Sequence, residues 1–200
     1  MLGYPVTLIS TQKGHEVKDR LATHFGSPEP WGYRKAVRLM KQAELFHRPV
    51  INLINTPGAF PGADAEKGGQ GEAIADSIAK MMDLKTPIIS LIFGEGGSGG
   101  ALALASSDQV WMTEKSEYSI LSPEGFASIL WKDSAKAPQA AEIMGLTPHD
   151  LLNAKVVEKI IPEPLDIASL QRDLFLKFKE LCSLHAEDLV TLRYQRFRKF

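Results

Sequence analysis

Short runs of large apolar and β-branched residues recur along the chain, separated by more polar stretches. A run of this kind, bounded by turn-forming residues, is typical of a buried strand. The runs predict strands over residues 5–10, 49–55, 87–93, 109–113, 118–121 and 156–161.

Between several of these runs, apolar residues recur with the period of a helix. The clearest case is residues 32–46, whose apolar stripe consists of Ala36, Leu39, Met40, Ala43 and Phe46. Further helices are predicted over 72–84, 101–105, 125–131 and 135–144, with others beginning at Thr147 and Leu165. Because strands and helices alternate, we expect an α/β fold with its ligand site outside the carboxyl ends of the strands.

Charged and titratable side chains outside these stripes are expected at the surface. His15 and His24 lie in a polar, loop-like segment, and His149 lies in the first turn of a helix capped by Thr147. None is expected to be a ligand or a base. The chain ends in a basic tail, and the basic face of helix 32–46 is expected to be solvated, with contact to substrate phosphates as the alternative. That face consists of Arg34, Lys35, Arg38 and Lys41.

The most informative stretch is residues 94–102 (GEGGSGGAL), which follow the predicted strand 87–93 and precede a predicted helix. Glycines permit positive φ and let main chain approach a neighbour closely. A helix N-terminus presents unpaired N–H groups and the positive end of the helix dipole. The stretch therefore predicts a site for a negatively charged or developing oxyanion.

Other motifs also match this stretch. Gly94, Gly96 and Gly99 fit a dinucleotide fingerprint, with Glu114 as its acidic residue, but the following helix is short for one. Residues 96–100 fit a nucleophile elbow, in which Ser98 would act with His149 or His185. A tight turn without chemistry is the remaining alternative.

A second loop of specified shape follows the strand 49–55. Residues 56–62 (TPGAFPG) combine prolines that fix φ with glycines that free it. The polar residues 63–71 after it are expected to be a connection, and the loop is expected to form a pocket wall with N–H groups facing inward.

Length and composition narrow the class of protein. Two hundred residues, 44% hydrophobic and 24% charged, with a net charge of −1, are ordinary for one globular domain. The lone Cys182 excludes an internal disulfide and a Cys-x-x-Cys metal site. With no membrane-length apolar stretch and no signal-like start, we expect a cytoplasmic protein without membrane contact.

Taken together, the two loops resemble a known family. Residues 56–62, 69–75 (GQGEAIA), 94–102 and 118–125 (YSILSPEG) are similar, in the same order, to segments of acetyl-CoA carboxylase carboxyltransferase α subunits. The resemblance runs from about Pro5 to Leu165. It implies a crotonase-like (ClpP/crotonase) fold, a ββα superhelix, as a domain over residues 1–165. Residues 166–200 would then be a helical segment packing on that domain or on a partner.

The resemblance also implies an activity and partners. Enzymes of this family move a carboxyl group from carboxybiotin, held on a biotin carboxyl carrier protein, to acetyl-CoA, which gives malonyl-CoA for fatty acid synthesis. A separate β subunit with a zinc ribbon binds acetyl-CoA, so this chain is expected to hold no metal, to be inactive alone and to join an α2β2 heterotetramer.

Within this picture, each glycine loop has an expected role. The N–H groups of Gly99 and Gly100, with Ala101 behind them, would face the biotin oxygen, and Gly96 and Gly97 would help to bind it. The facing wall would consist of Gly58, Ala59, Phe60 and Pro61. Glu95 is expected to pin the turn through backbone N–H groups.

The sequence departs from the family in places, and other functions stay open. Asn55 stands where relatives usually carry Asp, and residues 166–169 replace a Gly-Gly-Ala-His segment, which puts subunit contacts in doubt. One alternative is a stand-alone crotonase-fold acyl-CoA hydratase or hydrolase using Glu95 or Glu124. Another is a non-catalytic scaffold, which would have no use for two glycine turns.

Overall fold

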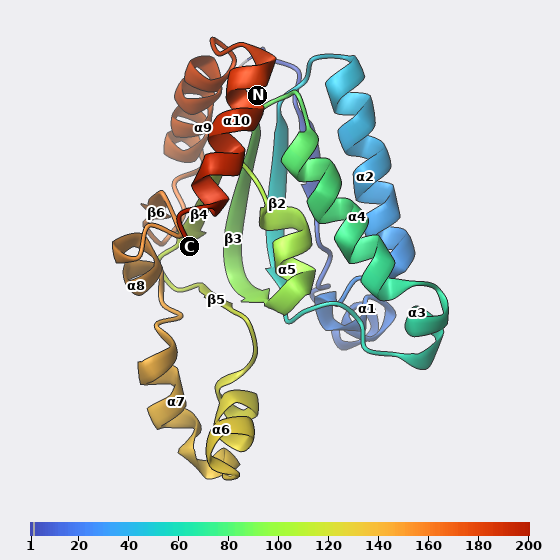
Figure 1. Cartoon of the computed structure of the whole chain (residues 1–200), viewed down its shortest axis with the longest axis vertical. Coiled ribbons are helices and arrows are strands. Elements are labelled where there is room, and N and C mark those ends of the chain that lie inside the picture. The colour runs from blue at the N-terminus through green and yellow to red at the C-terminus, as the bar shows by residue number, and fades with distance from the viewer. Residues whose placement is uncertain (2) are drawn as a thin grey trace.

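The fold is built on a parallel sheet, seen in a computed structural model that describes residues 1 and 3–200. Its strand order is β1-β2-β3-β4-β6, and β5 pairs with the end of β3 (Figure 1). The strands are β1 (Thr7–Ser10), β2 (Val50–Thr56), β3 (Ile88–Gly97), β4 (Gln109–Thr113), β5 (Glu117–Ser119) and β6 (Lys159–Ile161).

Helices and single turns connect these strands. The α-helices are α1 (Val17–Ala22), α2 (Pro30–Leu45), α3 (Ala63–Lys67), α4 (Gln70–Asp83), α5 (Ser98–Ala105), α6 (Pro123–Trp131), α7 (Ala137–Met144), α8 (Pro148–Asn153), α9 (Ile167–Leu181) and α10 (Ala186–Phe197). Two short 3₁₀ turns are η1 (His24–Gly26) and η2 (Ser134–Lys136). None of the helices in the described part of the chain is long and apolar enough to cross a membrane.

Consecutive strand residues point to opposite faces of the sheet, and both faces are covered. In β3, Ile88 and Ile92 pack with α2, α4 and α5, whereas Ile89 and Leu91 pack with α9 and α10. A parallel sheet buried on both faces explains why its strands appear in the sequence as nearly continuous apolar runs. The boundary expected at residue 165 stays a prediction, although α9 and α10 do pack on the sheet.

Helices α6 and α7 form an arm that extends away from the body of the molecule (Figure 1). They pack on each other and on η2. Several large apolar side chains of the arm are exposed, among them Ile129, Leu130 and Ile143. The predicted caps next to the arm are confirmed, since Ser122 Oγ accepts from Gly125 N and Thr147 Oγ1 accepts from Asp150 N.

The end of β3 differs from the prediction. The strand was expected to stop at Phe93, yet it continues to Gly97, and α5 begins at Ser98 rather than at Ala101. Gly94, with φ of +101°, lies where the pairing with β2 shifts register. Glycine backbone accommodates this irregularity, and β5 then supplies a new partner strand for residues 95–97.

Two predicted loops and one predicted helix are also corrected. The segment 15–30 contains α1 and η1, and residues 63–71 contain α3 and the start of α4. Helix α1 is only 6 residues long and has no buried residue, so it offers too few apolar positions for a stripe to predict it. The C-terminal helix is divided at residues 182–185, which lets both α9 and α10 pack on the sheet.

Two of the four basic residues near the C-terminus, Arg193 and Arg196, are buried in ion pairs rather than forming an exposed tail. Arg193 is 1% exposed and donates from Nε and Nη2 to the two Asp108 oxygens, at 2.8 and 3.0 Å. Arg196 makes the same kind of pair with Glu158, with Nε 2.7 Å from Oε1. The last basic residues, Arg198 and Lys199, are exposed.

Candidate functional site

The two glycine loops meet at the carboxyl ends of β2 and β3. A Cβ atom at Gly97 would overlap the Pro57 carbonyl and lie 3.0 Å from Gly58 N. A Cβ atom at Gly100 would overlap Ala59 N and lie 2.7 Å from Gly58 C. The backbones can therefore touch only because both positions are glycine. The structure brings together the loops that the sequence singled out.

The first turn of α5 lies where the two glycine loops meet, and it begins at the exposed Ser98. Gly97 is its N-cap, and no side chain caps the first turn, which begins with Ser98, Gly99 and Gly100. N–H groups at the start of a helix have no intrahelical acceptor and lie at the positive end of the dipole. Gly100 and Ala101 are buried, whereas Gly99 is partly exposed. Gly99 is thus the more accessible of the two predicted donors.

The facing loop uses most of its own N–H groups. Gly58 N donates to Thr56 Oγ1 at 3.1 Å, and Phe60 N donates to the Pro28 carbonyl at 3.0 Å. These two groups hold the loop in shape instead of facing inward as expected. Of the wall residues that have an N–H, Ala59 is the one without a hydrogen-bond acceptor among the described residues. Pro61 is exposed at the end of the wall.

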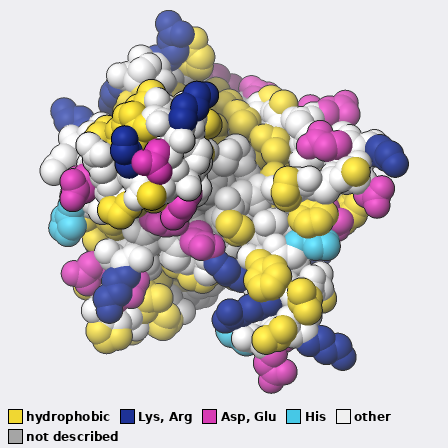
Figure 2. All heavy atoms as spheres, turned by 90° about the horizontal axis from the view of Figure 1, so that it is seen from below, with side chains coloured by type: hydrophobic (Ala, Val, Ile, Leu, Met, Phe, Trp, Pro, Cys, Tyr) yellow, Lys and Arg dark blue, Asp and Glu magenta, His cyan; other side chains and the backbone are white. Residues whose placement is uncertain are grey.

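A mostly apolar groove of about 530 Å³ adjoins the first turn of α5. Figure 2 looks onto this end of the molecule and shows hydrophobic side chains on both sides of a hollow. Burial raises the pKa of Tyr118, in this groove, to about 12, so its phenol is neutral near pH 7. The groove is lined by Ser98, Gly99, Leu102, Tyr118, Ser119, Ile120, Leu151 and Val156.

Tyr33 is buried and contacts the first turn of α5. Its hydroxyl donates to the Gly100 carbonyl at 3.2 Å, and burial raises its pKa far above the ordinary value. No role was predicted for Tyr33 from the sequence. It follows Trp31-Gly32 at the start of a helix, and no local pattern connects it to a glycine that lies 67 residues further along the chain.

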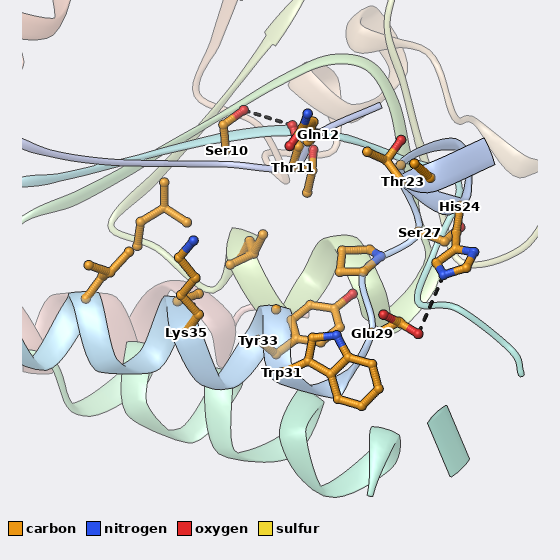
Figure 3. Close-up of a pocket in the computed structure, with 18 of the residues that line it drawn as sticks. Ser10, Thr11, Gln12, Thr23, His24, Ser27, Glu29, Trp31, Tyr33 and Lys35 are labelled. Carbon is orange, nitrogen blue, oxygen red and sulfur yellow. Dashed lines mark hydrogen bonds and ion pairs between the residues drawn. The ribbon is translucent and has the colours of Figure 1, made fainter. Parts of the chain in front are cut away.

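A second cavity, of about 430 Å³, lies between β1 and helices α1 and α2 (Figure 3). Ser10, Thr11 and Gln12 line it from β1 and the turn after it, opposite Trp31 and Lys35 of α2. Of the basic face predicted on α2, Lys35 lines this cavity, and Arg34, Arg38 and Lys41 are exposed. Contact with substrate phosphates stays a prediction.

Of the three histidines predicted at the surface, two are found there. His15 and His149 are exposed, and His185, for which no surface position was predicted, is exposed as well. His24 is half-buried instead, because its ring stacks on Phe60 with the centroids 4.0 Å apart. Its Nε2 lies 3.5 Å from Glu29 Oε1 (Figure 3). The histidine expected at the surface therefore contacts the wall loop.

The ionisable residues near the glycines have structural partners. Glu95 forms an ion pair with Lys13, and its N–H donates to Asn55 Oδ1 at 3.2 Å. An ion pair, rather than the expected bonds from backbone N–H groups, thus holds its carboxylate. Glu124 is exposed at the start of the arm. The hydratase alternative, which needs one of these glutamates as an acid or base, stays a prediction.

The two weaker motif interpretations fit the structure less well. Gly94 and Gly96 lie within β3, whereas a dinucleotide fingerprint needs them in the turn between strand and helix. Ser98 Oγ makes no hydrogen bond to a histidine among the described residues, which an activated nucleophile would require. In the described part of the chain, no three His, Cys, Asp or Glu side chains are grouped as metal ligands.

Comparison with known proteins decides the family. The family described as "Acetyl co-enzyme A carboxylase carboxyltransferase-like" matches residues 1–200. This chain belongs to that family. It is 55% identical over 203 residues to the acetyl-coenzyme A carboxylase carboxyl transferase subunit alpha of Streptococcus gordonii, covering 99% of this chain and 79% of that protein. The subunit of the same name from Streptococcus thermophilus is equally similar, at 55% over 203 residues.

Solved structures establish the fold. A Pseudomonas malonate decarboxylase MdcD–MdcE heterodimer contains a chain that matches with a TM-score of 0.70 and 18% identity, covering 98% of this chain and 86% of that one. The transcarboxylase 12S structure matches with a TM-score of 0.69 and 20% identity, covering 78% of this chain and 31% of that one. The crotonase-like fold of carboxyltransferases, expected from the family resemblance, is confirmed.

Proposed function

We propose that this chain is the α subunit of an acetyl-CoA carboxylase carboxyltransferase and supplies the carboxybiotin side of a site shared with a β subunit. One observation carries the proposal: the two glycine loops meet in backbone contact in a chain 55% identical to proteins named as this subunit. The reaction moves a carboxyl group from carboxybiotin, on a carrier protein, to acetyl-CoA. The product is malonyl-CoA for fatty acid synthesis.

The chemistry requires donors for negative charge. Loss of CO₂ from N-carboxybiotin breaks the N–C bond and leaves charge on the ureido oxygen. Removal of a methyl proton from acetyl-CoA leaves charge on the thioester oxygen. Fixed N–H groups stabilise such charge without reorganising, and one donor typically contributes about 10²–10³ in rate.

We assign the donors for the biotin oxygen to Gly99 and Gly100, in the uncapped first turn of α5. Gly58, Ala59, Phe60 and Pro61 form the facing wall, and Ala59 has the N–H left over from holding that loop. Gly97 packs against Pro57 of the wall loop, Gly96 pairs with Thr56 at the end of β2, and the buried Ala101 anchors the helix behind them.

No side-chain base is needed in this scheme. The ureido nitrogen of biotin, left with an electron pair when CO₂ departs, takes the proton from acetyl-CoA. The enolate then attacks CO₂ and forms the new C–C bond. This fits a site in which Glu95 is committed to Lys13.

The partners follow from the same assignment. A β subunit with a zinc ribbon supplies acetyl-CoA binding, and a biotin carboxyl carrier protein delivers carboxybiotin. The two kinds of subunit assemble as an α2β2 heterotetramer in the cytoplasm. The apolar groove beside Gly99 is open to such a partner.

The test is to co-purify this chain with a candidate β subunit and to measure carboxyl transfer from malonyl-CoA to biotin. We expect transfer by the pair and by neither chain alone. Turnover of an acyl-CoA by this chain alone would replace the proposal with a hydratase or hydrolase function. A stable but inert pair would indicate a scaffold.

A further inference from the structure

Gln70, the first residue of α4, joins two segments that are far apart in the sequence. Its side chain is 3% exposed, and its Nε2 donates to the Pro28 carbonyl at 2.9 Å and to the Phe60 carbonyl at 3.1 Å. Phe60 N donates to the same Pro28 carbonyl at 3.0 Å. The Phe60 N–H is therefore bonded to Pro28 directly, and the Phe60 carbonyl is joined to Pro28 through the Gln70 amide.

The Phe60 ring is held as well. His24 stacks on one side of it, with ring planes 23° apart. Gly62 lies close against the ring, since a Cβ atom there would overlap Phe60 Cε1. Wall residue 60 is thus fixed through its side chain and its backbone, and Gln70 is the residue that contacts both segments.

The next residue inward from Phe60 is Ala59. Ala59 N lies directly against the position that a Cβ atom of Gly100 would occupy. A shift of the Phe60 peptide would therefore move the Ala59 N–H relative to the first turn of α5. Displacements of about 1 Å at a reacting group can lower a rate about 10²-fold.

We infer that Gln70 is a positioning residue for carboxyl transfer: through Phe60 it sets where the Ala59 N–H stands relative to Gly99 and Gly100. The inference rests on the proposed function. Gln70 reaches the substrate only through Phe60 and Ala59. Its Oε1 is buried and has no partner in the described part of the chain, so the two donated bonds are what orient its amide.

The test compares Gln70→Met, which keeps the length of the side chain but removes its donor, with Thr86→Val. Thr86 is also 3% exposed and also donates to a backbone carbonyl, that of Arg48 at 3.0 Å, but it lies before β3, at the opposite end of the strand from the glycines. Gln70→Met removes two donated hydrogen bonds and Thr86→Val removes one. Transfer is measured with the intact α–β pair, together with thermal unfolding.

We expect Gln70→Met to lower kcat about ten- to a hundredfold with KM for malonyl-CoA within about twofold. Thr86→Val should also lower the melting temperature and should leave kcat within about twofold. Equal kcat in the two variants would overturn the inference, because Gln70 would then be only a structural residue.

A second readout does not depend on activity. Amide hydrogen exchange of residues 57–62 should become at least about tenfold faster in Gln70→Met and stay unchanged in Thr86→Val. Unchanged exchange in both variants would overturn the inference that Gln70 holds this loop. An inert wild-type pair would instead count against the proposed function, while the exchange experiment would still decide whether Gln70 holds the loop.

Discussion

Gly99 and Gly100 are adjacent, yet a methyl group would have opposite consequences at the two positions. At Gly100 it would overlap Ala59 N and lie 2.8 Å from the Tyr33 hydroxyl. At Gly99 the nearest atom would be Ile74 Cγ2, at 3.8 Å, which is ordinary contact. One glycine is therefore required by packing, and the other is not.

This difference gives a prediction at the residue scale. Gly100→Ala should lower the free energy of unfolding by about 2–4 kcal/mol, because backbone must move to admit the new atom. Gly99→Ala should change it by less than about 1 kcal/mol, since alanine favours a helix. Urea denaturation of the two variants checks this. Equal losses would contradict the contact described between α5 and the wall loop.

At the scale of elements, Arg193 attaches α10 to the end of α4 and the start of β3. Besides its pair with Asp108, Arg193 donates from Nη1 to the carbonyls of Met81 and Leu84, at 2.6 and 2.7 Å. It thereby satisfies acceptors at the end of α4 and holds the carboxylate that accepts from Ile88 N at the start of β3. A buried pair of this kind matters most when one partner is removed.

We predict that Arg193→Met lowers the free energy of unfolding by about 3–5 kcal/mol, because it leaves the Asp108 carboxylate buried without its cation. The exposed Arg198→Met, in the same part of the chain, should change it by less than about 0.5 kcal/mol. Urea denaturation measures both. If the two variants were equally stable, the basic residues near the C-terminus would be the exposed tail that composition alone suggests.

At the scale of the whole molecule, the body and the arm differ in how they are held. The central strands are covered on both faces, whereas α6 and α7 pack on each other and on η2. Regions with few buried apolar contacts open locally at a lower free energy than the core does.

We therefore predict that amides of α6 and α7 exchange with solvent roughly a hundredfold or more faster than those of β3 in the isolated chain. Helix α4, which packs on the sheet, is the matched helical control and should exchange at nearly the rate of the core. Native-state hydrogen exchange followed by mass spectrometry gives all three rates. Uniform exchange over arm and core would show that the arm unfolds only with the whole molecule.

Much of this architecture is readable from local pattern. The strands β2 and β4 follow from apolar runs and the helices α2 and α4 from apolar stripes, and each is found close to its predicted range, whereas β3 begins close to its predicted start and ends later. The two glycine loops stand out by composition, since residues 94–100 contain five glycines and residues 56–62 contain two glycines and two prolines. Their similarity to the carboxyltransferase family is confirmed by the family match over residues 1–200.

What local pattern cannot supply is contact between distant segments. Tyr33 with Gly100, Gln70 with Phe60 and Arg193 with Asp108 join residues separated by 67, 10 and 85 positions. Nothing beside Arg193 in the sequence marks it as buried, and nothing beside His24 indicates a stacked ring. These side chains acquire their roles only from neighbours that the chain brings to them when it folds.

The sequence by itself thus determined the fold class, the family and the position of the two loops, because apolar period and glycine spacing are local properties. The tertiary structure decided which glycine is packed and which is accessible, which N–H groups the wall loop keeps for itself, and where β3 ends. Those outcomes depend on which backbone groups from different strands come into contact and which hydrogen-bond partners they find. Such contacts exist only once the chain has folded.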